Sequence, residues 1–425
     1  MTNLTLYILN SNLLSTIGKY LLLILPIALP IILLIAIWVV RFRWLTMKFV
    51  DAQKTCLLEI RLPKEITKSP LAMEIFFTHL AQSGAGNYGE AFIDGKTRAW
   101  FSCEIVSTGG QVRFFVWCSN ATKFRNLVEA QLYAQYPNLE IFEADDYTKD
   151  FYFDTEKYPL FGLQYTLVQP DPYPIKTYID YGLDQDQKDE YKIDPITSVI
   201  EFLGSLKKGE NAWIQILLQK HEKEGVFHGK LGEPKDLKKE VEDEIKKIKK
   251  STVPEGDEKT TLKFPNPTKG QQAVIAALER SATKTPYDCM IRSIYITENG
   301  AFVPANIGGL VGCFKQYGSK DLNGFKPGLL SDADDAKKDW GRIFSLYQKK
   351  LDNDVLDVKK SLLYAYKLRS FFQYPYKNYK DNKPFVLTTE ELATIFHFPS
   401  GMVSQTPTLK RVPSKKSEAP SNLPI

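Results

Sequence analysis

Residues 100–118 read WFSCEIVSTGGQVRFFVWC, with an apolar strand on each side of Gly109-Gly110. Glycine tolerates the positive φ angles of a tight two-residue turn, so this stretch predicts a β-hairpin. With the two glycines as the turn, core-type residues pair across one face: Phe101 with Cys118, Cys103 with Val116, and Ile105 with Phe114. A slip of one residue would scramble both faces, so the pattern defines the register.

The segments on either side of this hairpin complete an α+β pattern. Before it, a short alternating strand over 56–62 precedes a helix over 69–80. After it, apolar residues at helical spacing over 123–136 precede a fourth strand over 139–143. The order strand–helix–strand–strand–helix–strand is that of a ferredoxin-like α+β sandwich, which we expect over residues 51–150.

A second α+β unit is expected over residues 151–330, with a degenerate copy of the first as one interpretation. Its predicted strands cover 161–168, 212–219 and 288–297, and its predicted helices cover 195–206, 268–283 and 303–317.

A charged insertion over 229–262 interrupts this second unit. Residues 234–250 hold twelve charges among seventeen positions, and a narrow apolar stripe runs through them: Leu237, Val241, Ile245 and Ile248. An exposed helix with i,i+4 ion pairs fits this pattern, and so does a helix that docks on a partner. The sequence leaves both alternatives open.

The C-terminal part divides into a helical region over 331–397 and a tail over 398–425. The aromatic stretch 371–379 contains lysine and proline, and it fits either stacking on nucleobases or ordinary packing. Five prolines and four Lys or Arg residues in the tail predict a mostly extended, flexible segment.

The N-terminal part, residues 1–50, reads as a membrane anchor. From Tyr20 to Val40 no side chain is charged, and about 20 apolar residues suffice to cross the hydrocarbon core of a bilayer. Pro26 and Pro30 are tolerated in membrane spans. A signal peptide has a shorter apolar region that ends in small residues, so that alternative fits less well; a buried soluble helix stays open as another.

Flanking cations set the expected orientation of this anchor. Only Lys19 precedes the span, whereas Arg41, Arg43 and Lys48 follow it closely. The positive-inside rule therefore predicts a single-pass membrane protein, with its N-terminus outside and its C-terminal domains in the cytoplasm.

Composition and motifs exclude several classes of function. The net charge of +5 is too small to indicate a nucleic-acid binder, and five cysteines with four histidines indicate neither a disulfide scaffold nor a Cys-rich zinc site. Gly84–Gly89 matches G-x-G-x-x-G but follows a helix, and Gly95-Lys96-Thr97 lacks the first glycine of a phosphate-binding loop. We therefore predict no enzyme activity and no catalytic, cofactor or metal site.

Four stretches carry a resemblance to a known group of proteins: 58–74, 99–114, 124–138 and 388–399. They resemble a bacterial domain of unknown function found in the membrane-anchored N-terminal part of type IV secretion and conjugative DNA-transfer proteins. In longer relatives a TraG/FtsK-like motor ATPase follows this region. The present chain stops at Ile425, so the resemblance implies that the motor is a separate subunit.

The resemblance also implies which residues would lie nearest that motor. These partner-docking candidates are Glu390, Glu391, His397 and Pro399, followed by the tail. His397 is expected to be a structural contact rather than a catalytic base.

Two functions therefore compete. The first is a non-catalytic, membrane-anchored scaffold or adaptor that recruits the motor ATPase. The second is a membrane-tethered module that itself binds nucleic acid through the charged insertion and the aromatic stretch. The expected partners are the lipid bilayer and the ATPase, and both a homo-oligomer and direct contact with DNA stay open.

Overall fold

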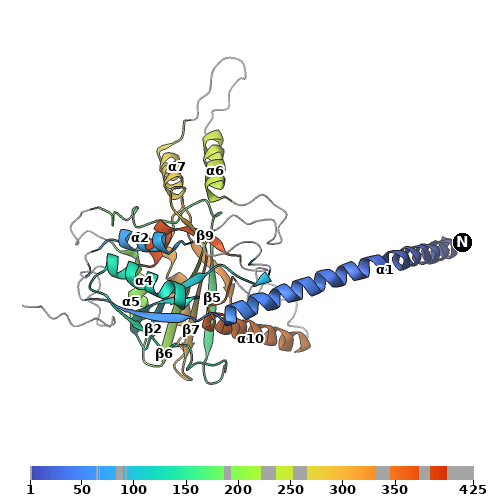
Figure 1. Ribbon diagram of the computed structural model, residues 1–425, viewed down its shortest axis with the longest axis horizontal. Helices are drawn as coiled ribbons and strands as arrows, with labels where there is room; N and C mark the ends of the chain where they lie inside the picture. The colour runs from blue at the N-terminus through green and yellow to red at the C-terminus, as the bar shows by residue number, and fades with distance from the viewer. Residues whose placement is uncertain are drawn as a thin grey trace, which may run out of the picture. The chain divides into compact units, whose positions relative to one another are not determined.

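The computed structural model describes residues 2–63, 66, 68–82, 90, 93–185, 193–221, 236–251, 266–331, 345–372 and 383–399; of residues 2–24 and 345–354 it describes only the helical backbone. These residues form two compact units. One contains residues 1–52 and 85–97, and the other contains residues 53–84 and 98–425 (Figure 1).

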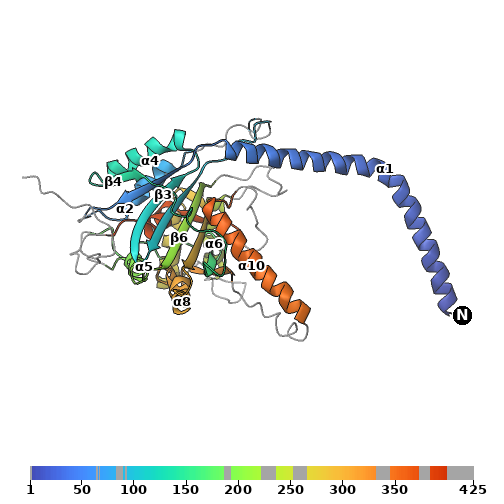
Figure 2. The same ribbon diagram turned by 90° about the horizontal axis from the view of Figure 1, so that it is seen from below.

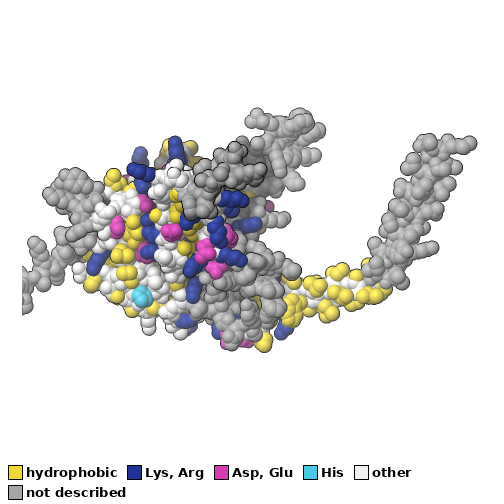
Figure 3. Space-filling view, turned by 90° about the horizontal axis from the view of Figure 1, so that it is seen from above, with side chains coloured by type: hydrophobic (Ala, Val, Ile, Leu, Met, Phe, Trp, Pro, Cys, Tyr) yellow, Lys and Arg dark blue, Asp and Glu magenta, His cyan; other side chains and the backbone are white. Residues whose placement is uncertain are grey.

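The first unit is built on one long helix, α1 (Thr2–Asp51), which contains Pro26 and Pro30. Its segment Leu25–Asp51 has a mean hydropathy of 2.4 over its most apolar stretch and is long and apolar enough to cross a membrane. Apolar side chains cover this part of the helix in Figure 3. The helix thus extends beyond both ends of the predicted span, residues 20–40.

The second unit contains a large antiparallel sheet. Its strands are β1 (Cys56–Arg61), β2 (Trp100–Thr108), β3 (Gln111–Cys118), β4 (Glu140–Glu143), β5 (Leu160–Leu167), β6 (Glu210–Lys220), β7 (Pro286–Thr297), β8 (Phe325–Leu330) and β9 (Phe385–Thr388). Their order across the sheet is β4-β1-β3-β2-β6-β7-β5-β8. Strand β9 pairs with the N-terminal part of β7, Pro286–Cys289.

The strand order repeats in mirror image about the pair β2–β6. β1 to β4 take the order β4-β1-β3-β2, and β5 to β8 take the order β6-β7-β5-β8, which is the same permutation reversed. The regions 51–150 and 151–330 therefore contribute equivalent halves to one continuous sheet. Glu104 pairs with Gln215 at the middle of the β2–β6 seam.

The hairpin register predicted from Gly109-Gly110 is confirmed: Phe101 lies opposite Cys118, Cys103 opposite Val116 and Ile105 opposite Phe114. These side chains belong to the main core. The helices on that face are α2 (Leu71–Leu80), α4 (Ala121–Gln135), α5 (Pro195–Gly204), α8 (Ala305–Gly312) and α11 (Thr389–Ile395), with a short 3-10 turn, η3, at Lys315–Tyr317.

The other face of the sheet is covered in part by α10 (Ser345–Lys367). Gly162 of β5 leaves room for this helix, since a Cβ atom there would lie 2.1 Å from the side chain of Leu362. Figure 2 shows α4 and α10 on opposite sides of the sheet.

Helices α6 (Leu237–Ser251) and α7 (Lys269–Ser281) lie side by side in Figure 1. The apolar stripe predicted in the insertion faces α7, where Leu237, Val241 and Ile245 pack with Ile275 and Leu278. This stripe therefore lies inside the protein and is not a free docking surface. The rest of the predicted insertion, residues 229–235 and 252–262, lies outside the described residues.

Two expectations about the C-terminal part need correction. The predicted helical region 331–397 includes a strand, β9, because Phe385–Thr388 extends the sheet beside β7. The predicted tail begins too early, because Phe398 is buried against the rings of Phe114 and Tyr136. Residues 400–425 lie outside the described part.

Candidate functional site

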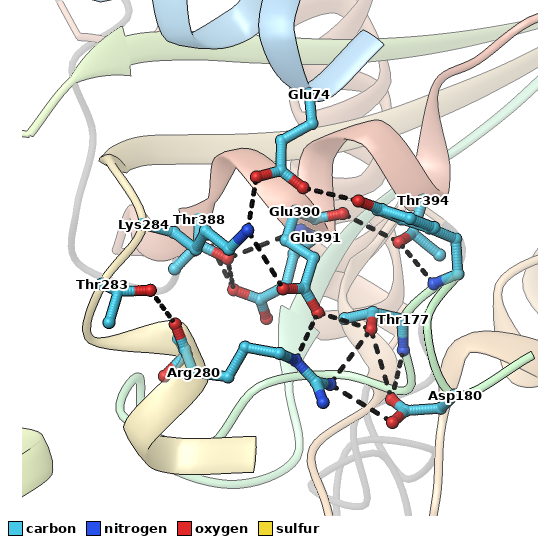
Figure 4. Close-up of polar contacts among 12 residues, drawn as sticks. Glu74, Thr177, Asp180, Arg280, Thr283, Lys284, Thr388, Glu390, Glu391 and Thr394 are labelled. Atoms are coloured by element: carbon cyan, nitrogen blue, oxygen red, sulfur yellow. Dashed lines mark hydrogen bonds and ion pairs between the residues drawn. The ribbon is translucent and has the colours of Figure 1, made fainter. Parts of the chain in front are cut away.

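Glu390 and Glu391, which sequence analysis placed nearest a partner, lie in a polar network beside strand β9, where it pairs with β7 (Figure 4). We call it the β9 charge cluster and define it as Glu74, Asp180, Arg280, Lys284 and Glu390. Glu74 comes from α2, Arg280 from α7 and Glu390 from α11, whereas Lys284 precedes β7 and Asp180 follows β5. The fold thus brings four distant segments of the chain to one place, since Arg280 and Lys284 are only four residues apart.

Local sequence explains why α11 starts where it does. Thr388 and Glu391 form a capping box, in which the Thr388 backbone N–H donates to Glu391 Oε2 at 2.8 Å. Two carboxylates in the first turn, those of Glu390 and Glu391, also lie at the positive end of the helix dipole. The ladder between β9 and β7 then fixes this helix start on the sheet.

Ion pairs connect the members of the β9 charge cluster. Lys284 Nζ lies 2.7 Å from Glu74 Oε1 and 3.8 Å from Glu390 Oε2. Arg280 Nε lies 3.0 Å from Glu390 Oε1, and its Nη2 lies 3.2 Å from Asp180 Oδ1. Burial opposes the charge of Arg280, but Glu390 and Asp180 outweigh that effect and raise the pKa of the guanidinium.

Hydroxyl groups donate further hydrogen bonds to the carboxylates of this cluster. Thr177 Oγ1 donates to Glu390 Oε1 at 2.6 Å, and the Tyr178 hydroxyl donates to Glu74 Oε2 at 2.8 Å. Burial and the neighbouring Glu74 raise the pKa of Tyr178, so this hydroxyl keeps its proton as a donor. These ion pairs and hydrogen bonds together link α11 to α2 and α7.

A second polar network lies on the opposite face of the sheet, over the β2–β6 seam. We call it the seam cluster and define it as Glu104, Asp146, Gln215, Arg292 and Arg369. Arg369 Nε lies 3.0 Å from Glu104 Oε1, and Arg369 also pairs with Asp146. Gln215 Nε2 donates to Glu104 Oε1 at 2.9 Å, so one carboxylate joins both strands of the seam to the arginine.

Arg292 has a different role in the seam cluster. Its guanidinium donates to the carbonyl oxygens of Ala365 at 2.6 Å and Ser370 at 3.1 Å, which places a cation at the C-terminal end of α10. Burial lowers the pKa of Arg292 to about 9. Arg369 follows the same helix with a φ of 48° and fixes the end of α10 over the sheet.

His397 lies next to the end of α11, in a third polar contact. Its Nε2 lies 2.9 Å from Asp194 Oδ1, and its Nδ1 lies 2.9 Å from the carbonyl oxygen of Ala393. Since Asp194 also caps α5 by accepting from the Ile196 N–H, the histidine links the two helices. Its surroundings are those of a structural contact.

The docking candidates therefore lie inside the protein. Glu390, Glu391 and His397 are at most 4% exposed, and Pro399 is buried beside Phe398. The physical reason is that the capping box and the aromatic contacts of Phe396 and Phe398 draw this segment onto the core. Its side chains do not present an exposed docking surface.

Sequence analysis missed the seam cluster. Asp146 follows the fourth predicted strand and pairs with Arg369, which keeps the pKa of this carboxyl low although burial acts the other way. One signal was present: Glu104 and Arg292 are charged residues inside strands that consist mainly of apolar residues. A charge inside such a strand indicates a buried partner.

The described residues contain no group of three or more His, Cys, Asp or Glu side chains placed to hold a metal ion. His221 pairs with Asp288 at 2.6 Å, and His79 is exposed on α2. Phe371 and Phe372 of the aromatic stretch are buried, whereas 373–379, Gly84–Gly89 and His228 lie outside the described part. What the two clusters can do chemically is to hold helices in place.

Comparison with known protein families identifies a match over most of the chain. No curated protein is similar to the chain. Residues 82–411, which include the seam cluster, the β9 charge cluster apart from Glu74 and most of the sheet, match a domain of unknown function, DUF8128. The chain therefore belongs to the DUF8128 family.

Proposed function

We propose that this protein is a non-catalytic, membrane-anchored scaffold or adaptor of a type IV secretion or conjugation-like system, which recruits a separate TraG/FtsK-like motor ATPase in the cytoplasm. The observation that carries the proposal is the segment Leu25–Asp51 of α1, which is apolar and buries none of its most apolar stretch inside the protein. A helix of this kind needs a partner for its apolar surface, and a bilayer supplies one.

The proposed orientation has the N-terminus outside the bacterial inner membrane and the large sheet inside the cytoplasm. Arg41, Arg43 and Lys48 support it, because all three follow the span and have exposed side chains. The five buried free cysteines of the second unit are consistent with a reducing compartment.

The second unit supports a scaffold role through its architecture. We interpret β1–β4 and β5–β8 with their helices as two copies of a ferredoxin-like unit, since each half has the strand order 4-1-3-2 of that fold. The charged groups of both clusters pair with one another, which supports a structural role for them. A rigid pair of such units would hold the segment that follows it in a fixed position, where the proposed motor can bind it.

The segment that contacts the motor in this proposal begins after Pro399. The β9 charge cluster and the rings around Phe398 fix the chain up to that point. Residues 400–425, which carry Lys410, Arg411, Lys415 and Lys416, follow this fixed position in the sequence.

The test is an affinity purification of the full-length protein in mild detergent, followed by mass spectrometry. We expect a TraG/FtsK-like ATPase to accompany the full chain and to be lost when residues 400–425 are deleted. A matched control replaces those residues by a tail of the same length and composition in scrambled order, which should also lose the ATPase. Recovery of the ATPase with both altered tails would contradict the assigned contact, and its absence from the full chain would contradict the adaptor function.

A second candidate function is a membrane-tethered nucleic-acid-binding module. The observation in its favour is the exposed C-terminal half of α6, which carries Lys246, Lys247, Lys249 and Lys250. Burial of Phe371 and Phe372 removes two of the aromatic rings expected to stack on bases. This candidate predicts DNA binding that weakens steeply with salt and is lost when these four lysines become glutamine, whereas Lys238→Gln/Lys239→Gln retains it.

A further inference from the structure

A loop of the first unit packs against α1 just beyond the proposed membrane span. Gly95 has a φ of +68°, and a Cβ atom at this position would lie 2.4 Å from the backbone carbon and 2.5 Å from the carbonyl oxygen of Leu45. No side chain fits there without displacing the helix backbone. The loop and the helix are therefore in backbone contact at a position that requires glycine.

The burial pattern of the helix agrees with this contact. Within residues 41–48, Thr46 is buried and Leu45 is half-buried, whereas the other six residues are exposed. A Cβ atom on Gly95 would also lie 2.7 Å from the backbone nitrogen of Thr46. In the same loop, Lys96 Nζ lies 2.8 Å from Glu90 Oε2, and this ion pair links two residues that are six positions apart.

The position of this contact along α1 determines how far the loop lies from the hydrocarbon core of the bilayer. Leu45 lies five residues after Val40, about 7.5 Å along the helix axis. The headgroup layer of a bilayer is roughly 5–7 Å thick on each side of the hydrocarbon core. If the helix is tilted, the distance from Val40 to Leu45 measured along the bilayer normal is shorter than the distance along the helix axis. The loop is therefore held at the level of the lipid headgroups.

The side chains at that level suit an interface between lipid and water. Ile93, two residues before Gly95, is 69% exposed, and Trp44 on the helix is 58% exposed. Arg41 and Lys48 are exposed on the same stretch of helix, where they would meet lipid phosphates. Apolar and aromatic groups flanked by cations are typical of segments at a membrane surface.

We infer that residues 93–97 form a second membrane contact, in which Ile93 inserts at the boundary between headgroups and acyl chains while Gly95 fixes the loop to α1. The inference rests on the proposed anchoring of α1 and goes beyond it. The partner is the phospholipid surface on the side of the second unit. This contact would limit rotation of the anchor relative to the bilayer, since a loop on one side of the helix is in the lipid.

The test places a nitroxide spin label at single introduced cysteines of the full-length protein in phosphatidylethanolamine–phosphatidylglycerol vesicles. The five native cysteines are buried, so labelling favours the introduced thiol. The labelled variants are Ile93→Cys, Leu29→Cys within the span and Lys250→Cys on α6. The readout is accessibility to oxygen, which concentrates in lipid, divided by accessibility to a water-soluble nickel complex.

We expect the ratio at position 93 to be several-fold higher than at 250 and lower than at 29. A ratio at 93 equal to that at 250, with a lipid value at 29, would overturn the loop contact and leave the anchor intact. A water-like ratio at 29 would overturn the anchor itself, and with it both proposals.

A glycine pair provides the matched control. Gly95→Val introduces a side chain where the helix backbone already lies, so the ratio at position 93 should fall to the value at 250. Gly300 has a similar φ of +84° but nothing within 4 Å of a Cβ, so Gly300→Val should leave the ratio at 93 unchanged. An unchanged ratio in Gly95→Val would overturn the role of Gly95 in holding the loop.

Discussion

Glu391 is a buried carboxyl group with competing influences on its charge. Burial raises its pKa to about 7, although backbone N–H groups of Thr388 and Ile175 donate to its oxygens at 2.8 and 2.9 Å and favour the charged form. The group titrates near neutral pH while it holds the start of α11. Its protonation is therefore coupled to the stability of this segment.

The sign of that coupling predicts a pH dependence. The unfolded chain loses the Glu391 proton near the ordinary value of 4.5, whereas the folded protein keeps it to about 7. Stability from this group is therefore fully present below about pH 4.5 and decreases as the pH rises to 7, by up to about 1.4 kcal/mol per pH unit. Denaturant unfolding of Glu391→Gln should lack this decrease.

Glu201→Gln, at an exposed position of α5, is the control for the pH experiment and should follow the wild-type curve. The same slope in wild type and Glu391→Gln would show that another group titrates. Because the Glu391→Gln variant presents an amide in place of one carboxylate oxygen, we also expect a loss of about 1–3 kcal/mol at every pH from an unsatisfied N–H group.

Arg369 illustrates how strongly one buried charge depends on another. Its side chain is 3% exposed and that of its partner Glu104 is fully buried. We predict that Arg369→Ala destabilises the protein by about 3–5 kcal/mol, because Glu104 is left buried without its cation. The control Arg125→Ala removes exposed pairs with Glu129 and Glu143 and should cost about 1 kcal/mol or less, measured by the same unfolding assay. Equal losses in the two variants would contradict a buried charge network at the seam.

At the scale of elements, the pairing of α6 with α7 is the most direct subject for a mutation. Ile245 packs against α7, whereas Lys246 beside it is exposed. We predict that Ile245→Ala destabilises this helix pair by about 2–5 kcal/mol and raises amide hydrogen exchange throughout α6, while Lys246→Ala changes neither. Unaltered exchange in Ile245→Ala would show that the apolar stripe does not hold α6 in place.

Several elements could be predicted because local chemistry defines them. The hairpin β2–β3 follows from Gly109-Gly110 and from core-type residues at alternate positions on one face, and its predicted register is correct. Strand β9 was missed because it has only four residues and is stabilised by pairing with β7, far away in the sequence. The end of α10 could not be predicted either, because its position depends on a hydrogen bond from Arg292 of β7, far away in the sequence.

At the scale of the whole molecule, the joining of the two halves could not be predicted. β2 and β6 would each be an edge strand in its own half, and their sequences show only that both are apolar. Their pairing buries two edges that would otherwise be exposed to intermolecular contacts. Glu104 of β2 and Gln215 of β6 secure the seam by bonding to each other, and Arg369, which lies outside both strands, donates to Glu104.

The central claim is that α1 anchors the protein in a membrane with the second unit in the cytoplasm. The most direct measurement labels Lys250→Cys with a membrane-impermeant maleimide in bacterial spheroplasts and in lysed, carbonate-washed membranes. We predict that the protein stays in the washed membranes and that the thiol reacts only after lysis. Reaction in intact spheroplasts would contradict the orientation, and release of the protein by carbonate would contradict the anchor.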